Sequence, residues 1–93
     1  MRYTVRLSDQ AAEDLGNIVS FIAQDNPQAG EKFGLALVEA AFSLATFPYR
    51  GQQMKQRPKA RKLLYRKYLI VYEVREREHH VEILRFLHGA QIK

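Results

Sequence analysis

The sequence of 93 residues contains no cysteine, which excludes disulfides, thiolate metal sites and cysteine nucleophiles together. Long apolar runs are also missing, because charged residues interrupt each apolar stretch within a few positions. We therefore expect neither a signal peptide nor a membrane span, and we expect a cytoplasmic protein. Hydrophobic residues still make up 46% of the chain, which is enough for one core, so we expect a single domain over residues 1–93.

The motifs of common active sites are absent as well. The sequence has no glycine-rich phosphate loop and no glycine-flanked nucleophilic serine. Its three histidines do not have the spacing of metal ligands, because His79 and His80 are adjacent and His88 stands alone. We therefore expect no metal and no cofactor, and a hydrolase or a nucleotide-binding protein is a poor interpretation.

Acidic residues are scarce in the second half of the chain. Residues 1–48 carry three basic and six acidic groups, for a net charge of −3, whereas residues 49–93 carry 12 basic and four acidic groups, for a net charge of +8. This asymmetry predicts a polyanion or an acidic protein as the partner of the second half. A solvated basic surface, which is common in small domains, is the alternative interpretation.

The hydrophobic pattern predicts the order β-α-α-β-β-β. Residues 2–8 alternate as a strand does, and after Ser8 as N-cap the apolar residues recur at helical spacing. The stretch "DNP" ends this helix and begins a second one, with Asn26 as cap and Pro27 at the first position. A polar loop, "QQMKQRPKA", precedes three strands, "RKLLY", "YLIVYEV" and "VEILRFL". An α+β domain, with a helical hairpin on one face of a mostly antiparallel sheet, buries these apolar faces.

The second predicted helix has two apolar faces and therefore needs two partners. One face is Phe33, Leu37, Ala40, Ala41, Leu44 and Phe47, and the other is Leu35, Val38, Phe42 and Ala45. Either the first helix and the sheet cover both faces, or the second face receives another protein.

The stretch "VEILRFLHGA" places Arg85 among apolar residues. Strand alternation predicts two faces: Val81, Ile83, Arg85 and Leu87 on one, and Glu82, Leu84, Phe86 and His88 on the other. A charge buried without a partner is costly, so Arg85 either pairs internally, with Glu73 or Glu82, or opens onto a surface. We predict a concave basic face that binds nucleic acid or an acidic peptide, with tyrosines available to stack on bases. Its target-binding residues are Arg57, Lys59, Arg61, Lys62, Arg85 and His88.

Several segments, in this order, resemble the RelE/ParE superfamily of toxins from bacterial type II toxin–antitoxin pairs, and most of all its ParE branch. They are "YTVRLSDQAAEDLGNIVSFIAQDNPQAGEKF", "FPYRG", "RKL", "YLIVYEV" and "VEILRFLHGA", and they cover nearly the whole chain. The resemblance implies a β-α-α-β-β-β toxin held inactive by a cognate antitoxin, ParD-like or other. The antitoxin's C-terminal segment would fold onto the toxin, and its N-terminal part would bind operator DNA, so that the toxin reaches the operator only through the antitoxin. We predict Leu35, Val38 and Phe42 as the antitoxin-binding surface.

The resemblance implies one of two activities. ParE-like members poison DNA gyrase without cutting DNA themselves, whereas RelE-like members enter the ribosome and cleave mRNA by metal-free acid–base chemistry. The chain departs from the RelE pattern, because only "GAQIK" follows His88, without a tyrosine, and Leu69 stands where RelE-like nucleases often carry an arginine. This favours a gyrase poison over an endoribonuclease, in which Arg61, Arg85 and His88 would be the catalytic groups. A non-toxic co-repressor that acts with its antitoxin is the third alternative.

Overall fold

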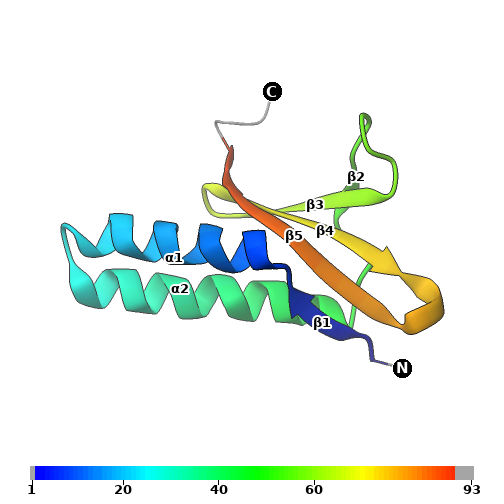
Figure 1. Cartoon of the computed structure of the whole chain (residues 1–93), viewed down its shortest axis with the longest axis horizontal. Helices are drawn as coiled ribbons and strands as arrows, with labels where there is room; N and C mark the ends of the chain where they lie inside the picture. Colours follow the sequence, from blue (N-terminus) through cyan, green and yellow to red (C-terminus); the bar gives the residue numbers. More distant parts are fainter. Residues whose placement is uncertain (1, 90–93) are drawn as a thin grey trace.

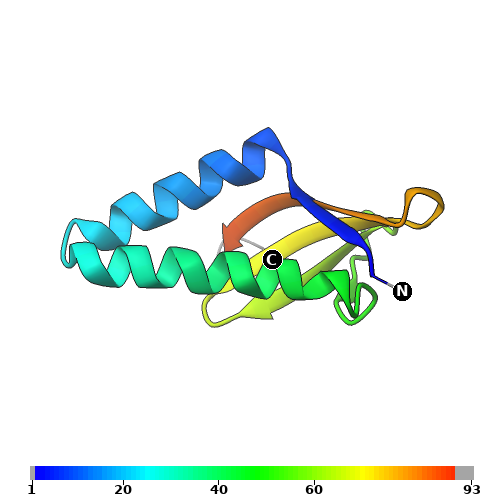
Figure 2. The same ribbon diagram turned by 90° about the horizontal axis from the view of Figure 1, so that it is seen from below.

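A computed structural model of the chain describes residues 2–89 and shows two helices on one face of a five-stranded sheet (Figures 1 and 2). The elements follow one another as β1 (Thr4–Leu7), α1 (Asp9–Ala23), α2 (Pro27–Phe42), the 3-10 helix η1 (Ser43–Ala45), β2 (Gln52–Gln53), β3 (Ala60–Tyr65), β4 (Tyr68–Arg75), the 3-10 helix η2 (Glu76–Glu78) and β5 (His80–His88). The strand order is β1-β5-β4-β3-β2, and only the β1–β5 pair is parallel. The predicted α+β fold is therefore confirmed. The short strand β2 is an addition, because the sequence pattern predicted a loop there.

Both helices begin where the sequence predicts. The Ser8 side chain accepts a hydrogen bond from the Ala11 N–H at 3.0 Å, and Asn26 accepts one from the Ala29 N–H at 3.1 Å. These side chains satisfy amide groups that the first turn of a helix leaves without partners. Neither α1 nor α2, the helices of the described residues 2–89, is long and apolar enough to cross a membrane.

The α1–α2 hairpin is held together by close packing at two glycines of α2. A Cβ atom on Gly30 would lie 2.8 Å from the backbone oxygen of Val19, and one on Gly34 would lie 2.7 Å from a Val19 methyl group. A larger residue at Gly30 would therefore push the helices apart, and one at Gly34 would displace the Val19 side chain. The two helices lie side by side as one layer on the sheet, as Figure 2 shows.

The core lies between this helical layer and the sheet. Its largest fully buried side chains are Tyr72, Phe86, Leu37, Leu44, Ile70, Ile83 and Val81. The second apolar face that the sequence predicts for α2 is divided by the structure: Ala45 is buried, whereas Leu35 and Phe42 are 63% and 48% exposed. Of the two alternatives, cover by the protein's own core therefore holds for Ala45, whereas Leu35 and Phe42 remain exposed.

A β-bulge in β5 changes which side chains face the helices. Val71 pairs with Arg85 and the next residue, Tyr72, pairs with Ile83, so that Leu84 is the extra residue. A bulge shifts the alternation of the strand by one position. The predicted division of β5 is therefore wrong beyond Leu84: Phe86 lies on the helix side with Ile83, and Arg85 lies on the opposite side.

Candidate functional site

Arg85 forms a bidentate ion pair with Asp14 of α1. The Arg85 Nε donates to one carboxylate oxygen at 2.8 Å and Nη2 donates to the other at 3.1 Å. This corrects the sequence-based prediction of Glu73 or Glu82 as the partner, since those carboxylates bind other cations. The sequence did not indicate Asp14 as the partner of Arg85, because most of the chain separates α1 from β5.

Asp14 also accepts a hydrogen bond from the backbone at the edge of β5. The strand β1 pairs with β5 only as far as Leu7 and Ile83, and the chain then turns into α1. Beyond that point, the Phe86 N–H has no strand beside it, and it donates to the Asp14 carboxylate at 3.0 Å. A buried amide without a partner is costly, so the carboxylate replaces the missing strand. One buried side chain thus holds α1, the backbone of β5 and Arg85 together.

The electrostatics of this pair keep both groups charged. Burial raises the pKa of Asp14, but the hydrogen bonds from Arg85, the Phe86 N–H and Gln10 outweigh burial, so the pKa is lowered overall. The hydrogen bond to Asp14 raises the pKa of Arg85. Because the carboxylate is buried while 43% of the Arg85 side chain is exposed, the guanidinium presents a fixed, partly open edge to solvent.

An open pocket of about 340 Å³ adjoins the ion pair, between α1 and the end of β5. It is lined by Asp14, Asn17, Ile18, Phe21, Tyr68, Arg85, Phe86, Leu87 and His88. The His88 and Tyr68 rings meet edge to face with centroids 5.3 Å apart, and Phe21 is 69% exposed at the pocket. Sequence reasoning missed Phe21, because its position at helical spacing did not distinguish it from core residues.

The structure brings two of the three predicted catalytic residues, Arg85 and His88, to one pocket and leaves Arg61 apart. Arg61 pairs with Tyr72 and His88 with Tyr68, so the two side chains lie on the helix side of the sheet, about 13 Å apart along β4. Arg85 leaves the strand on the opposite side, but its side chain binds Asp14 and lines the same pocket as His88. The Arg61 guanidinium binds the backbone oxygens of Tyr49 at 3.2 Å and Gly51 at 2.8 Å and lies over the Tyr49 ring, so it holds the loop before β2 in place.

The remaining predicted target-binding residues lie on or near the face of the sheet that the helices leave open. Lys62 and Arg85 flank Val71 in one row across the strands, and Arg57 reaches Glu73 at 3.1 Å. Lys59 is exposed just before β3. The single basic face of the sequence-based prediction is thus reduced to these four residues, because the pleat places Arg61 and His88 on the helix side.

The predicted antitoxin-binding residues form an apolar row on the outer side of α2. Leu35, Val38 and Phe42 are spaced three and four residues apart, which places them on one helix face. Leu35 and Phe42 are exposed and Val38 is half-buried. Within residues 2–89, this row therefore remains open to a partner.

Comparison with known proteins identifies the fold and the family. A family model described as "ParE toxin of type II toxin-antitoxin system, parDE" matches residues 5–93. The chain is similar to one in the crystal structure of the RelBE2 toxin–antitoxin complex from Mycobacterium tuberculosis, with a TM-score of 0.76 and 26% identity over 95% of this chain and 99% of that chain. It is also similar in fold to a chain of the chromosomal ParDE TA system from P. aeruginosa, with a TM-score of 0.78 and 22% identity over 94% of this chain and 96% of that one. No curated protein matches the sequence.

Proposed function

The chain belongs to the ParE toxin family of type II toxin–antitoxin systems, and from this premise we propose that it inhibits growth by binding and poisoning DNA gyrase in the cytoplasm. A cognate antitoxin neutralises it. In this proposal the protein is a binder and not an enzyme, and it needs no cofactor.

The observation that carries this choice of target is that Arg61 lies apart from Arg85 and His88 and that both arginines are already engaged. Metal-free cleavage of RNA needs a general base, a general acid and a cation around one phosphate. Here Arg61 is engaged by backbone oxygens and lies apart on β3, and Arg85, which lines a pocket with His88, is engaged by Asp14. The residues after Gly89, on which the sequence-based preference for a gyrase poison also rested, lie outside the described residues. A folded scaffold that presents fixed cations suits binding better than proton transfer.

The antitoxin is the second partner in this proposal. The RelBE2 relative was solved as a toxin–antitoxin complex, which supports a cognate antitoxin for this chain. We assign the outer row of α2, Leu35, Val38 and Phe42, to that contact, because large apolar groups exposed in a row are typical of a groove or helix partner. Operator recognition then belongs to the antitoxin.

A plasmid supercoiling and cleavage assay with purified toxin, gyrase and ATP tests the proposal. We expect linear DNA to accumulate and supercoiling to be lost, and added antitoxin to reverse both effects. Arg85→Ala should abolish both effects of the toxin while leaving it folded. Lys32→Ala, which removes an exposed charge on α2, is the matched control. An inert but folded toxin would overturn the proposal, and cleavage of mRNA on translating ribosomes would establish the endoribonuclease instead. If neither activity occurs but the toxin strengthens operator binding by its antitoxin, the co-repressor is established.

A further inference from the structure

The open face of the sheet carries an ordered array of charges. The register places Arg6, Glu82 and Glu73 side by side on β1, β5 and β4. The next row along the strands contains Arg85, Val71 and Lys62, and the row after it contains Leu87, Leu69 and Leu64. None of the helices within residues 2–89 covers this face (Figure 1).

Two carboxylates lie directly opposite each other at the centre of the array. Glu73 and Glu82 are cross-strand partners, and only 15% and 10% of their side chains are exposed. Like charges in this position destabilise a sheet unless other groups compensate for them. Burial raises the pKa of Glu82, but the hydrogen bond from His80 and the nearby arginines lower it overall, so the carboxylate remains charged.

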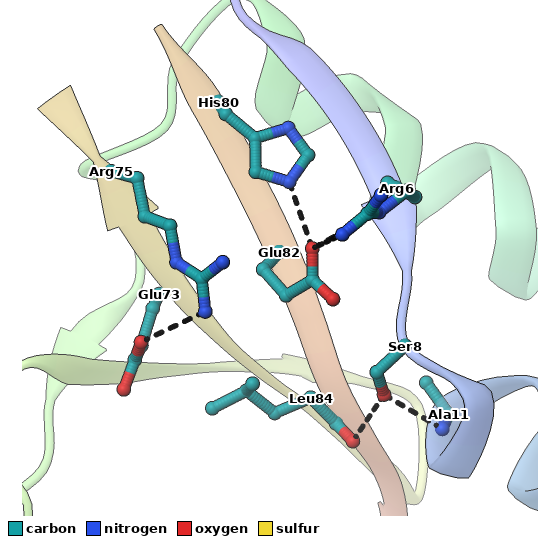
Figure 3. Close-up of polar contacts among 8 residues, drawn as sticks. All are labelled: Arg6, Ser8, Ala11, Glu73, Arg75, His80, Glu82 and Leu84. Carbon is teal, nitrogen blue, oxygen red and sulfur yellow. Dashed lines mark hydrogen bonds and ion pairs between the residues drawn. The ribbon is translucent and has the colours of Figure 1, made fainter. Parts of the chain in front are cut away.

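Arginines and a histidine form ion pairs with these two carboxylates. Glu82 binds Arg6 at 3.3 Å and His80 at 2.8 Å, as Figure 3 shows. Glu73 binds Arg57 at 3.1 Å and Arg75 at 3.7 Å.

The two carboxylates are more buried than the arginines that bind them. The arginine side chains are exposed, by 69% for Arg6, 62% for Arg57 and 43% for Arg75. A guanidinium has five N–H donors, more than these contacts use, so the buried carboxylates fix the arginines while further donors point outward. Such a layer of pre-ordered cations is complementary to a regular array of anions.

The aromatic residues of the sheet lie on the other side. The tyrosines of β3 and β4, Tyr65, Tyr68 and Tyr72, share the helix side with Ile70 and Phe86. The open face therefore presents cations without tyrosine or phenylalanine rings, and the His80 ring on it is held against Glu82, so the predicted stacking of tyrosines on bases does not fit it. Single-stranded nucleic acid is bound chiefly by stacking on aromatic rings, whereas duplex backbones are bound through their phosphates.

We propose that the open face, through Arg6, Arg57 and Arg75, binds the phosphate backbone of duplex DNA without reading its sequence. The choice of DNA rests on the proposed function, because the proposed target, gyrase, acts on duplex DNA. The contact adds to that function a direct toxin–DNA interaction, distinct from the operator recognition that belongs to the antitoxin. It also gives a role to Arg6 and Arg75, which the sequence pattern did not single out.

Binding of the toxin alone to a labelled DNA duplex of arbitrary sequence, followed by fluorescence anisotropy over a salt series, tests this inference. We expect the logarithm of the binding constant to fall linearly with the logarithm of the salt concentration. Arg6→Gln, Arg57→Gln and Arg75→Gln should each reduce the slope by about 1 and weaken binding several-fold at low salt. Lys32→Gln on α2 removes the same charge from the helical layer and should leave the slope unchanged.

A charge-neutral variant separates specific contact from net charge. Arg6→Gln combined with Glu82→Gln keeps the net charge of the protein. We expect this double variant to show the same reduction of the salt slope as Arg6→Gln alone. Thermal unfolding confirms that each variant is folded.

The inference is overturned if the toxin does not bind duplex DNA at low salt, if Lys32→Gln acts like Arg6→Gln, or if the charge-neutral variant binds as the wild type does. Preference for a single strand, an RNA duplex or a polyglutamate peptide would overturn it as well. No gyrase is present in the DNA-binding assay, so a negative result there does not contradict gyrase poisoning. A negative supercoiling assay, in turn, does not contradict DNA binding, which the anisotropy measurement tests separately.

Discussion

The Arg85 guanidinium on β5 and the Asp14 carboxylate on α1 are joined by two hydrogen bonds across 71 residues of sequence. The carboxylate is buried and also accepts a hydrogen bond from the Phe86 N–H, so the pair fixes the helix against the part of the β5 edge that β1 does not cover. Arg85 is consequently both a structural residue and part of the open face. Its two roles have to be separated by experiment.

A double-mutant cycle on Asp14→Asn and Arg85→Gln measures the structural role. We expect a coupling of about 1–3 kcal/mol, because a charged hydrogen-bonded pair with one buried partner is worth more than an exposed pair, although the exposure of Arg85 limits the value. The same cycle on Arg57→Gln and Glu73→Gln is the control, since Arg57 is more exposed, and should give a coupling of less than about 1 kcal/mol. Chemical denaturation provides the free energies of unfolding, and equal couplings for the two pairs would contradict this account.

Asp14 also predicts how stability depends on pH. Its pKa in the folded protein is lowered, so the stability that it contributes is present above the ordinary value of about 4 and is lost as the pH falls through the folded-state value. The difference in unfolding free energy between the wild type and Asp14→Asn should therefore be constant near neutral pH and shrink below about pH 4. Denaturant titrations over that range test the sign, and a difference that stays constant down to low pH would exclude a depressed pKa.

Sequence reasoning succeeded where a local pattern has a local cause. The caps at Ser8 and Asn26 and the order of helices and main strands follow from residues close together in the chain, and the structure confirms them. The bulge at Leu84 has no such pattern, because it depends on the pairing of β4 with β5. Because of that extra residue, Phe86 lies in the core and Arg85 lies on the opposite side of the strand. The partner of Arg85 is therefore on a helix near the other end of the sequence.

A second carboxylate, Glu76, predicts an unusual tyrosine titration. Glu76 accepts hydrogen bonds from the hydroxyl groups of Tyr3, at 2.5 Å, and Tyr49. The hydrogen bond to Glu76 is the main cause that raises the pKa of Tyr3 to about 12. Glu76→Gln should lower this pKa toward the ordinary value of about 10, as measured by an NMR titration of ring-labelled tyrosine.

The control for this titration is Glu78→Gln, an exposed glutamate in the same 3-10 helix, which should leave Tyr3 unchanged. The raised pKa also means that Tyr3 contributes stability below about pH 10 and loses it as the pH rises toward 12. Wild-type protein should accordingly lose more stability over that range than Glu76→Gln does. Identical alkaline unfolding curves would contradict this.

Phe42→Glu should weaken antitoxin binding while leaving the toxin folded. The Phe42 side chain lies on the outer row of α2 and is 48% exposed, so a charge there meets water in the free toxin but would be buried under a partner. We expect the dissociation constant for the antitoxin to rise by at least tenfold in calorimetric titration, with little change in thermal unfolding of the toxin. Leu64→Glu on β3 is the matched control, because Leu64 is equally apolar and 65% exposed but lies on the open face of the sheet. Equal losses for both substitutions would place the antitoxin on the sheet as well as on α2, and a Phe42→Glu toxin that fails to fold would show that Phe42 belongs to the core.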